Sequence, residues 1–126
     1  MIKLKPLFNR INKTCFNNKL KPCKLKYVKG AKKEIAYFTS HYIPDTIKPD
    51  YNYMPEIAVI QRNYKEADLI KILIHEMTHY ENWMTWKRKG KPHSKNFFLK
   101  IVKYEMAYVD KYKIKLNYLI CEAKGL

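Results

Sequence analysis

The sequence is poor in cysteine, and this shortage excludes the folds that depend on cysteine pairs. Its three cysteines, Cys15, Cys23 and Cys121, are an odd number and form no C-x-x-C pair. A disulfide framework or a zinc ribbon needs such pairs. A structural zinc on these cysteines and His41 would also lack closely spaced ligands. We therefore expect free thiols that are mostly buried.

Long apolar runs are missing too, which excludes membrane-spanning helices. No stretch approaches the roughly 20 residues that a bilayer requires. Residues 1–6 contain neither the apolar core nor the cleavage site of a signal peptide. We therefore expect a cytoplasmic protein with no membrane contact. Hydrophobic residues still make up 47% of the chain, which predicts one globular domain over residues 1–126, and we expect a monomer.

Acidic residues are scarce, since 11 Asp and Glu stand against 26 Lys and Arg, for a formal net charge of +15. Such an excess predicts a polyanionic partner, DNA above all. Arginine is also scarce, with only Arg10, Arg62 and Arg88, although its planar side chain suits phosphate best. A biased coding composition would give the same excess of lysine. Both interpretations stay open at this point.

Hydrophobic periodicity predicts an N-terminal helix followed by a small sheet. Apolar residues at helical spacing predict the helix over residues 4–17. Alternating residues predict a strand over 24–29, and residues 30–33 are typical of a hairpin turn into a second strand over 34–39. A third strand, over 56–62, contains an unbroken apolar run. The sheet is expected to be antiparallel or mixed.

A long helix follows the sheet, with clear signals at both ends. Asn63 and Glu66 have the spacing of a capping box at its start. Three basic residues at 87–89, then Gly90 and Pro92, predict its C-terminal end.

A last helix is predicted over residues 94–119. Ser94 is a suitable N-cap, and large apolar residues recur along the segment at helical spacing. The order of one helix, three strands and two long helices predicts an α+β fold.

The first long helix contains the pattern H-E-x-x-H, formed by His75, Glu76 and His79. Residues four apart lie on one helical face about one turn apart, so the two imidazoles can bind one ion. Glu76 lies about 100° around the helix from His75. From there its carboxylate can act as general base on a metal-bound water without being a ligand. The pattern therefore predicts a hydrolytic zinc site.

A catalytic zinc needs a third protein ligand and an open position. His93 is the best candidate, because it lies between the turn-forming Pro92 and the predicted cap Ser94. Glu105 is the alternative third ligand, since it lies within the apolar stripe of the last helix, where an unpaired carboxylate is costly. We favour Glu105 as a partner of a ligand histidine. Pairing with a lysine is the remaining interpretation.

Three segments of the sequence resemble the SprT-like (Spartan-type) metallopeptidase domain. They are residues 54–60, residues 69–79 and the run from Gly90 to Phe98, which contains the third histidine before two aromatic residues. The resemblance implies a zincin-like fold with zinc as cofactor. By resemblance, His75, His79 and His93 bind the zinc, and Glu76 is the catalytic acid and base.

The same resemblance implies a protein or peptide substrate. The better-known members of the family cleave proteins that are crosslinked to DNA. Many members carry a C-terminal zinc ribbon, which we do not expect here because the sequence contains no C-x-x-C pair. A zinc endopeptidase that acts near DNA is therefore the leading hypothesis. A minimal zinc peptidase of the YgjP type with no DNA link, and a non-catalytic basic DNA-binding module with structural zinc, are the alternatives.

The strand before the H-E-x-x-H helix has a further expected role. In zincin folds an edge strand beside the cleft binds extended substrate through its backbone. We assign this role to the apolar run Ile57, Ala58, Val59 and Ile60. The alternative is an ordinary core strand.

Overall fold

The computed structural model of the chain describes residues 1–30, 35–46, 48–85 and 93–114. The predicted α+β order of one helix, three strands and two helices is confirmed. In chain order the elements are α1 (Leu4–Cys15), β1 (Lys24–Val28), β2 (Ala36–Thr39), β3 (Glu56–Ile60), α2 (Glu66–Met84) and α3 (Lys95–Tyr112).

The strands form a mixed three-stranded sheet with β3 in the middle, in the order β1-β3-β2. β1 pairs with β3 in parallel, with Leu25 opposite Ile57. β2 pairs with the other side of β3 in antiparallel orientation, with Phe38 opposite Ile57. The predicted hairpin between the first two strands is therefore wrong, because β3 lies between them. Residues 31–34, which belong to that turn, lie outside the described residues.

The central position of β3 also corrects the prediction of a substrate-binding edge. Ile57, Ala58, Val59 and Ile60 are between 0% and 3% exposed, as expected for an unbroken apolar run in the central strand of a sheet. Both backbone edges of β3 pair with neighbouring strands, so neither is free to bind a peptide. The interpretation of residues 57–60 as an ordinary core strand is the correct one.

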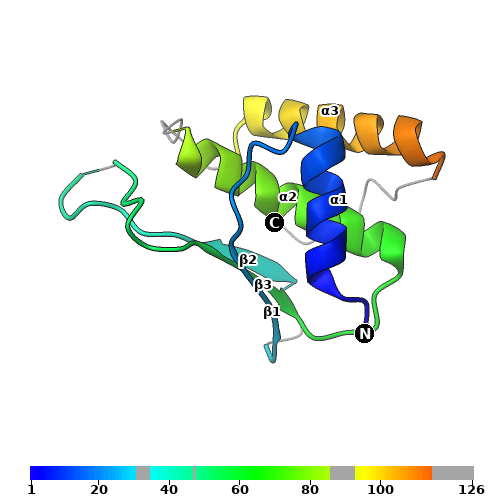
Figure 1. Cartoon of the computed structure of the whole chain (residues 1–126), viewed down its shortest axis with the longest axis horizontal. Helices are drawn as coiled ribbons and strands as arrows, with labels where there is room; N and C mark the ends of the chain where they lie inside the picture. Colours follow the sequence, from blue (N-terminus) through cyan, green and yellow to red (C-terminus); the bar gives the residue numbers. More distant parts are fainter. Residues whose placement is uncertain (31–34, 47, 86–92, 115–126) are drawn as a thin grey trace.

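The three helices lie together on one side of the sheet, with α2 between the sheet and α3 (Figure 1). α2 is buried on all sides over residues 69–78, which explains why that stretch carries hardly any polar side chains outside the site. Phe38 of β2 stacks on Tyr80 of α2, with 5.5 Å between the ring centroids. This contact places β2, an outer strand, beside the helix that contains the H-E-x-x-H pattern.

The start of α2 differs from the predicted capping box. Lys65 is the N-cap residue, and no side chain caps the helix. Asn63 lies two residues before the cap, because the hydroxyl of Tyr64 donates to the carbonyl oxygen of Ile60 and holds the connection in a non-helical conformation. The helix ends at Met84. The predicted C-terminal signals at residues 87–92 lie outside the described residues.

The two other helices end where left-handed residues begin. After α1, Asn17 and Asn18 have φ angles of 52° and 59°, a conformation that asparagine tolerates better than most residues. α3 begins as predicted, with the Ser94 hydroxyl accepting a hydrogen bond from the backbone N–H of Phe97. It ends at Tyr112, earlier than expected, because Lys113 has a φ of 54°. Residues 115–119 of the predicted helix lie outside the described residues.

Cys15 and Cys23 are free, as predicted, but they are half-buried rather than mostly buried, and Cys121 lies outside the described residues. Burial raises the pKa of both described thiols to about 12. In the part of the chain that the structure describes, no helix is both long and apolar enough to cross a membrane.

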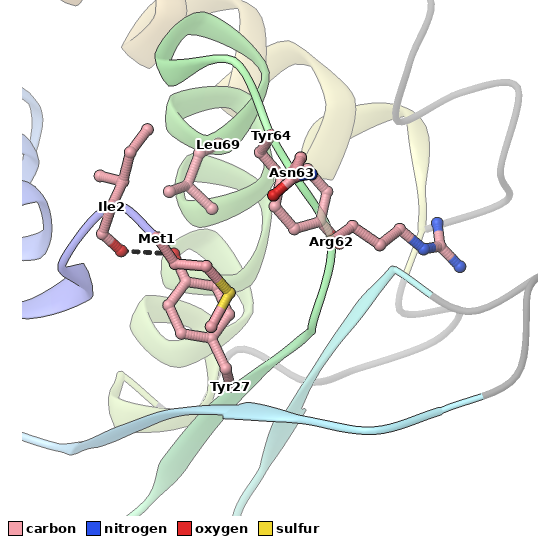
Figure 2. Close-up of a pocket in the computed structure, with 7 residues that line it drawn as sticks. All are labelled: Met1, Ile2, Tyr27, Arg62, Asn63, Tyr64 and Leu69. Carbon is pink, nitrogen blue, oxygen red and sulfur yellow. Dashed lines mark hydrogen bonds between the residues drawn. The ribbon is translucent and has the colours of Figure 1, made fainter.

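A small pocket of about 120 Å³ lies at the N-terminal end of α2 (Figure 2). The hydroxyl of Tyr27 donates to the carbonyl oxygen of Ile2 across it. The pocket is lined by Met1, Ile2, Tyr27, Arg62, Asn63, Tyr64 and Leu69. None of the predicted site residues lines it, so the candidate site lies elsewhere.

Candidate metal centre

The structure brings the three predicted ligand histidines together. His75 and His79 lie one turn apart on α2, and His93 lies just before the cap of α3. The Nε2 atom of His93 is 3.3 Å from that of His75 and 3.1 Å from that of His79. Among the described residues these three form a group with metal-binding potential, with candidate ligand atoms within 4.8 Å of one another.

The spacing of the three ring nitrogens fits a zinc ion. Nitrogen ligands about 2.0–2.1 Å from a tetrahedral zinc lie about 3.3 Å from each other. The two measured separations are close to this value. A neutral imidazole that carries its proton on Nδ1 offers its Nε2 lone pair, and three such lone pairs at this spacing repel each other unless a cation lies between them. The donor set therefore suits zinc, with one position open for a substrate.

The environment favours the neutral form of His75 and His93, which is the form that binds a metal. Burial, together with the nearby rings of His79 and His93, lowers the pKa of His75 to about 3. His93 is exposed overall, but the partial desolvation of its ring among the neighbouring rings also lowers its pKa below the usual value. The lone pairs at the centre of the group are therefore available to a metal rather than to protons.

Phe97 is a site residue to which the sequence alone assigned no role, although it lies in the run from Gly90 to Phe98 that resembles the SprT-like domain. Its ring stacks on His79, with 4.3 Å between centroids. It also makes edge contacts with His75 at 5.0 Å and with His93 at 5.3 Å. One aromatic ring on α3 thus packs against all three imidazoles and fixes their orientation. The sequence signals were its position four residues after His93 and its place as the first of two aromatic residues in the run from Gly90 to Phe98.

Glu76 lies beside the metal-binding group but is not part of it. The residue is 3% exposed, and its Oε2 atom has no hydrogen-bond partner. Burial raises the pKa of the carboxyl group to about 8. With this pKa the group is mostly protonated at neutral pH while no cation is near. A metal ion held by the neighbouring histidines would favour its charged form, and the unpaired Oε2 atom of that carboxylate can accept a proton from a reacting water.

The SprT-like family model matches residues 4–117. The chain belongs to the SprT-like family. Its fold is therefore that of a zinc-metallopeptidase-like domain, and the three histidines fit the metal site of such a domain. No curated protein matches the chain.

In this SprT-like domain Glu105 lies against Lys71 of α2. The Lys71 Nζ atom is 3.5 Å from Glu105 Oε1, and both side chains are 2% exposed. The Nδ1 atom of His75 has no hydrogen-bond partner, so Glu105 does not support that ligand by a hydrogen bond. The structure thus pairs Glu105 with a lysine, one of the interpretations that the sequence left open, and its support of another ligand histidine stays a prediction.

Glu81 is a second residue that sequence reasoning missed. Its side chain is 4% exposed and accepts hydrogen bonds from Lys19 at 2.9 Å, from Lys100 at 3.1 Å and from the Tyr104 hydroxyl at 2.6 Å. Burial alone would raise its pKa, but the three donors bring it below the usual value. Glu81 lies on α2, two residues beyond His79. Its carboxylate thus connects α2 to α3 and to the segment that follows α1. No local pattern reveals these partners, because they lie far apart in sequence.

Proposed function

We propose that this SprT-like domain is a zinc-dependent endopeptidase with Glu76 as general base. The observation that supports the proposal best is the convergence of three histidine nitrogens beside a buried carboxylate whose Oε2 atom is unpaired. The substrate class is protein or peptide, as the family match suggests.

Each residue of the site has a separate task in the proposed reaction. His75, His79 and His93 would hold zinc, which supplies the Lewis acidity that polarises the scissile carbonyl and acidifies the attacking water. Glu76 accepts a proton from that water and returns it to the leaving amine. Phe97 keeps the imidazoles in place, and its apolar ring limits the access of bulk water to that side of the site.

Two glutamate-to-glutamine substitutions, one at Glu76 and one at a control position, test the role of Glu76. Glu76→Gln preserves the shape of the side chain but removes the base, so we expect about one zinc per chain and a loss of cleavage of roughly 10²- to 10⁴-fold. The control is Glu66→Gln on the same helix, which removes only an exposed ion pair with Arg10. Elemental analysis measures the zinc content, and casein is the substrate of the cleavage assay. Wild-type cleavage by Glu76→Gln would rule out the assigned base.

The alternative function is a non-catalytic module that keeps zinc for stability. Structural zinc sites are closed by four protein ligands. Among the described residues the metal-binding group offers three, and the buried acid beside them would be a cost to a purely structural site. The geometry therefore favours the peptidase.

We further propose that the substrate is protein associated with DNA. The proposal rests on the net charge of +15 and on exposed lysines along α1 and β1, which suit a polyanion. These exposed lysines are Lys3, Lys5, Lys13, Lys24 and Lys26. A peptidase of the YgjP type would have the same metal centre without DNA affinity, so binding to DNA separates the two hypotheses.

A further inference from the structure

Exposed aromatic rings gather on the segment between β2 and β3, close to the end of α2. We call His41, Tyr51 and Tyr53 the aromatic platform. Tyr51 is 61% exposed and Tyr53 is 54% exposed, and His41 is exposed as well. His41 stacks on Tyr53 with 4.5 Å between the ring centroids. A contiguous group of exposed aromatic rings, unlike a single exposed ring, indicates a binding surface.

Hydrogen bonds to α2 hold the platform in place. The hydroxyl of Tyr51 donates to the carbonyl oxygen of Met84 at 2.7 Å, and Trp83 Nε1 donates to the carbonyl oxygen of His41 at 3.0 Å. The backbone N–H of Asp50 donates to the same oxygen of His41 at 2.9 Å. The rings are therefore exposed but pre-organised, so a ligand would lose little affinity to ordering them.

The platform lies on the same side of α2 as the proposed general base. Tyr51 contacts Trp83 edge-on at 5.3 Å. Trp83 lies seven residues after Glu76, which is about 20° short of two full helical turns and about 10.5 Å along the axis. Phe38 of β2 packs against the same Trp83 at 6.2 Å. Trp83 thus contacts both the outer strand β2, which lies beside α2, and the platform.

The local charge indicates which kind of partner the platform suits. Residues 41–54 contain Asp45 and Asp50 against a single basic residue, Lys48, although the whole chain has a net charge of +15. Surfaces that stack nucleic-acid bases combine aromatic rings with cations for the phosphates. Here the segment that carries the rings has two carboxylates and only one lysine in its sequence instead. The platform therefore suits a peptide rather than a nucleic acid.

We propose that the aromatic platform binds a large apolar or aromatic side chain of the substrate peptide. This inference rests on the proposed peptidase function, for which it specifies the substrate. An extended peptide rises about 3.3 Å per residue, so the 10.5 Å offset along α2 corresponds to about three residues. The preferred side chain is therefore about three residues from the bond that is cleaved.

Tyr53→Ala tests the platform, because it removes an exposed ring and leaves both tethers of the loop to α2 intact. Tyr37→Ala is the matched control: Tyr37 is 41% exposed on β2, but next to Phe38, so it points to the sheet face away from α2. Tyr53→Phe should behave as wild type. The probes are two labelled peptides of alanine, serine and lysine, one with a single phenylalanine and one with alanine in its place.

The expected result is a preference of wild type for the phenylalanine peptide, cut about three residues from the ring. Tyr53→Ala should raise KM for that peptide about tenfold, the size of one aromatic contact, with kcat and the alanine peptide unchanged. Equal losses on both peptides, or the same loss in Tyr37→Ala, would overturn the proposal. So would tight binding of a thymidine oligonucleotide that Tyr53→Ala abolishes, since the platform would then be a nucleic-acid surface.

Binding to zinc-loaded Glu76→Gln protein separates this inference from the peptidase function. Fluorescence anisotropy should show about tenfold tighter binding of the phenylalanine peptide, and Tyr53→Ala should remove the difference. If that preference is found while wild type cleaves neither peptide, the platform stands and the peptidase proposal fails. If wild type cleaves both peptides equally and neither binds better, the peptidase stands and the platform proposal fails.

Discussion

The three ligand histidines are held to very different degrees by the protein around them. His75 is fully buried, His79 is half-buried and His93 is exposed. His93 owes its place to neighbours on α3, where it contacts Phe97 and stacks on Phe98 at 6.1 Å. The third ligand is therefore the one whose loss the rest of the fold would tolerate best.

The first prediction at the residue scale compares His93→Ala with Glu105→Gln. His93→Ala removes one of three metal-binding nitrogens, so zinc affinity should fall strongly while the apo fold persists. Glu105→Gln leaves the buried Lys71 ammonium without its carboxylate, so stability should fall by about 3–5 kcal/mol, with at most a roughly 10- to 100-fold change in zinc affinity. Competition with a chelating dye measures affinity, and thermal unfolding measures stability.

The opposite pattern would change the ligand set. If Glu105→Gln empties the site and His93→Ala leaves it filled, the metal is held by two histidines and a glutamate. Glu66→Gln is again the control, because its exposed ion pair with Arg10 should matter little to either measurement.

At the scale of elements, the start of α3 links helix capping to the metal centre. The Ser94 hydroxyl accepts from the Phe97 N–H at 3.3 Å, and Phe97 is the ring that packs on all three imidazoles. The first turn of α3 thus fixes both the direction in which His93 enters the site and the ring behind it.

Ser94→Ala should therefore destabilise the protein and weaken zinc binding together. Loss of an N-cap typically costs about 1 kcal/mol. Asn63→Ala is the matched control, because Asn63 is exposed and does not cap α2, so its effect should stay within about 0.5 kcal/mol. Urea unfolding with and without zinc measures both effects. Equal losses in the two variants would contradict the assignment of Ser94 as the functional cap.

The elements also show which features of the fold can be predicted from the sequence. The helices and strands were predictable because their apolar periodicity is local, and His75, Glu76 and His79 because their spacing lies within one helix. The order of the strands was not, since pairing joins residues distant in sequence. The apolar run from Ile57 to Ile60 did contain the signal for a central strand, because it lacks the alternation of a strand with one free face.

The remaining parts of the site depend on tertiary contacts that no local pattern contains. Glu81 receives donors 62, 19 and 23 residues away, and each of them alone resembles an ordinary surface lysine or a core tyrosine. Likewise, the aromatic platform became visible only when Tyr51 was found against Trp83. Sequence spacing identifies the ligands, whereas the supporting contacts require the folded chain.

For the whole molecule, the net charge of +15 leads to a prediction about salt. If the chain neutralises about six phosphates, its affinity for duplex DNA should fall about 10³-fold between about 50 mM and about 200 mM salt. Fluorescence anisotropy with a labelled duplex measures this, and a polyglutamate of equal charge is the control polyanion. The double variant Lys5→Glu/Lys13→Glu should have a less steep dependence of DNA affinity on salt concentration, since both lysines are exposed on α1. An affinity that does not respond to salt, or equal binding of polyglutamate, would favour the compositional explanation of the charge.

The order β1-β3-β2 also has a consequence for how the chain acquires its structure during synthesis. The central strand is the last of the three to leave the ribosome, and its parallel pairing joins Lys24 to Glu56, 32 positions later. Until residue 60 has emerged, β1 and β2 lack the central strand with which both of them pair, so their backbone groups have no ladder partner. Folding must therefore wait for β3 and close a long loop in one step, which slows it relative to a hairpin-first fold.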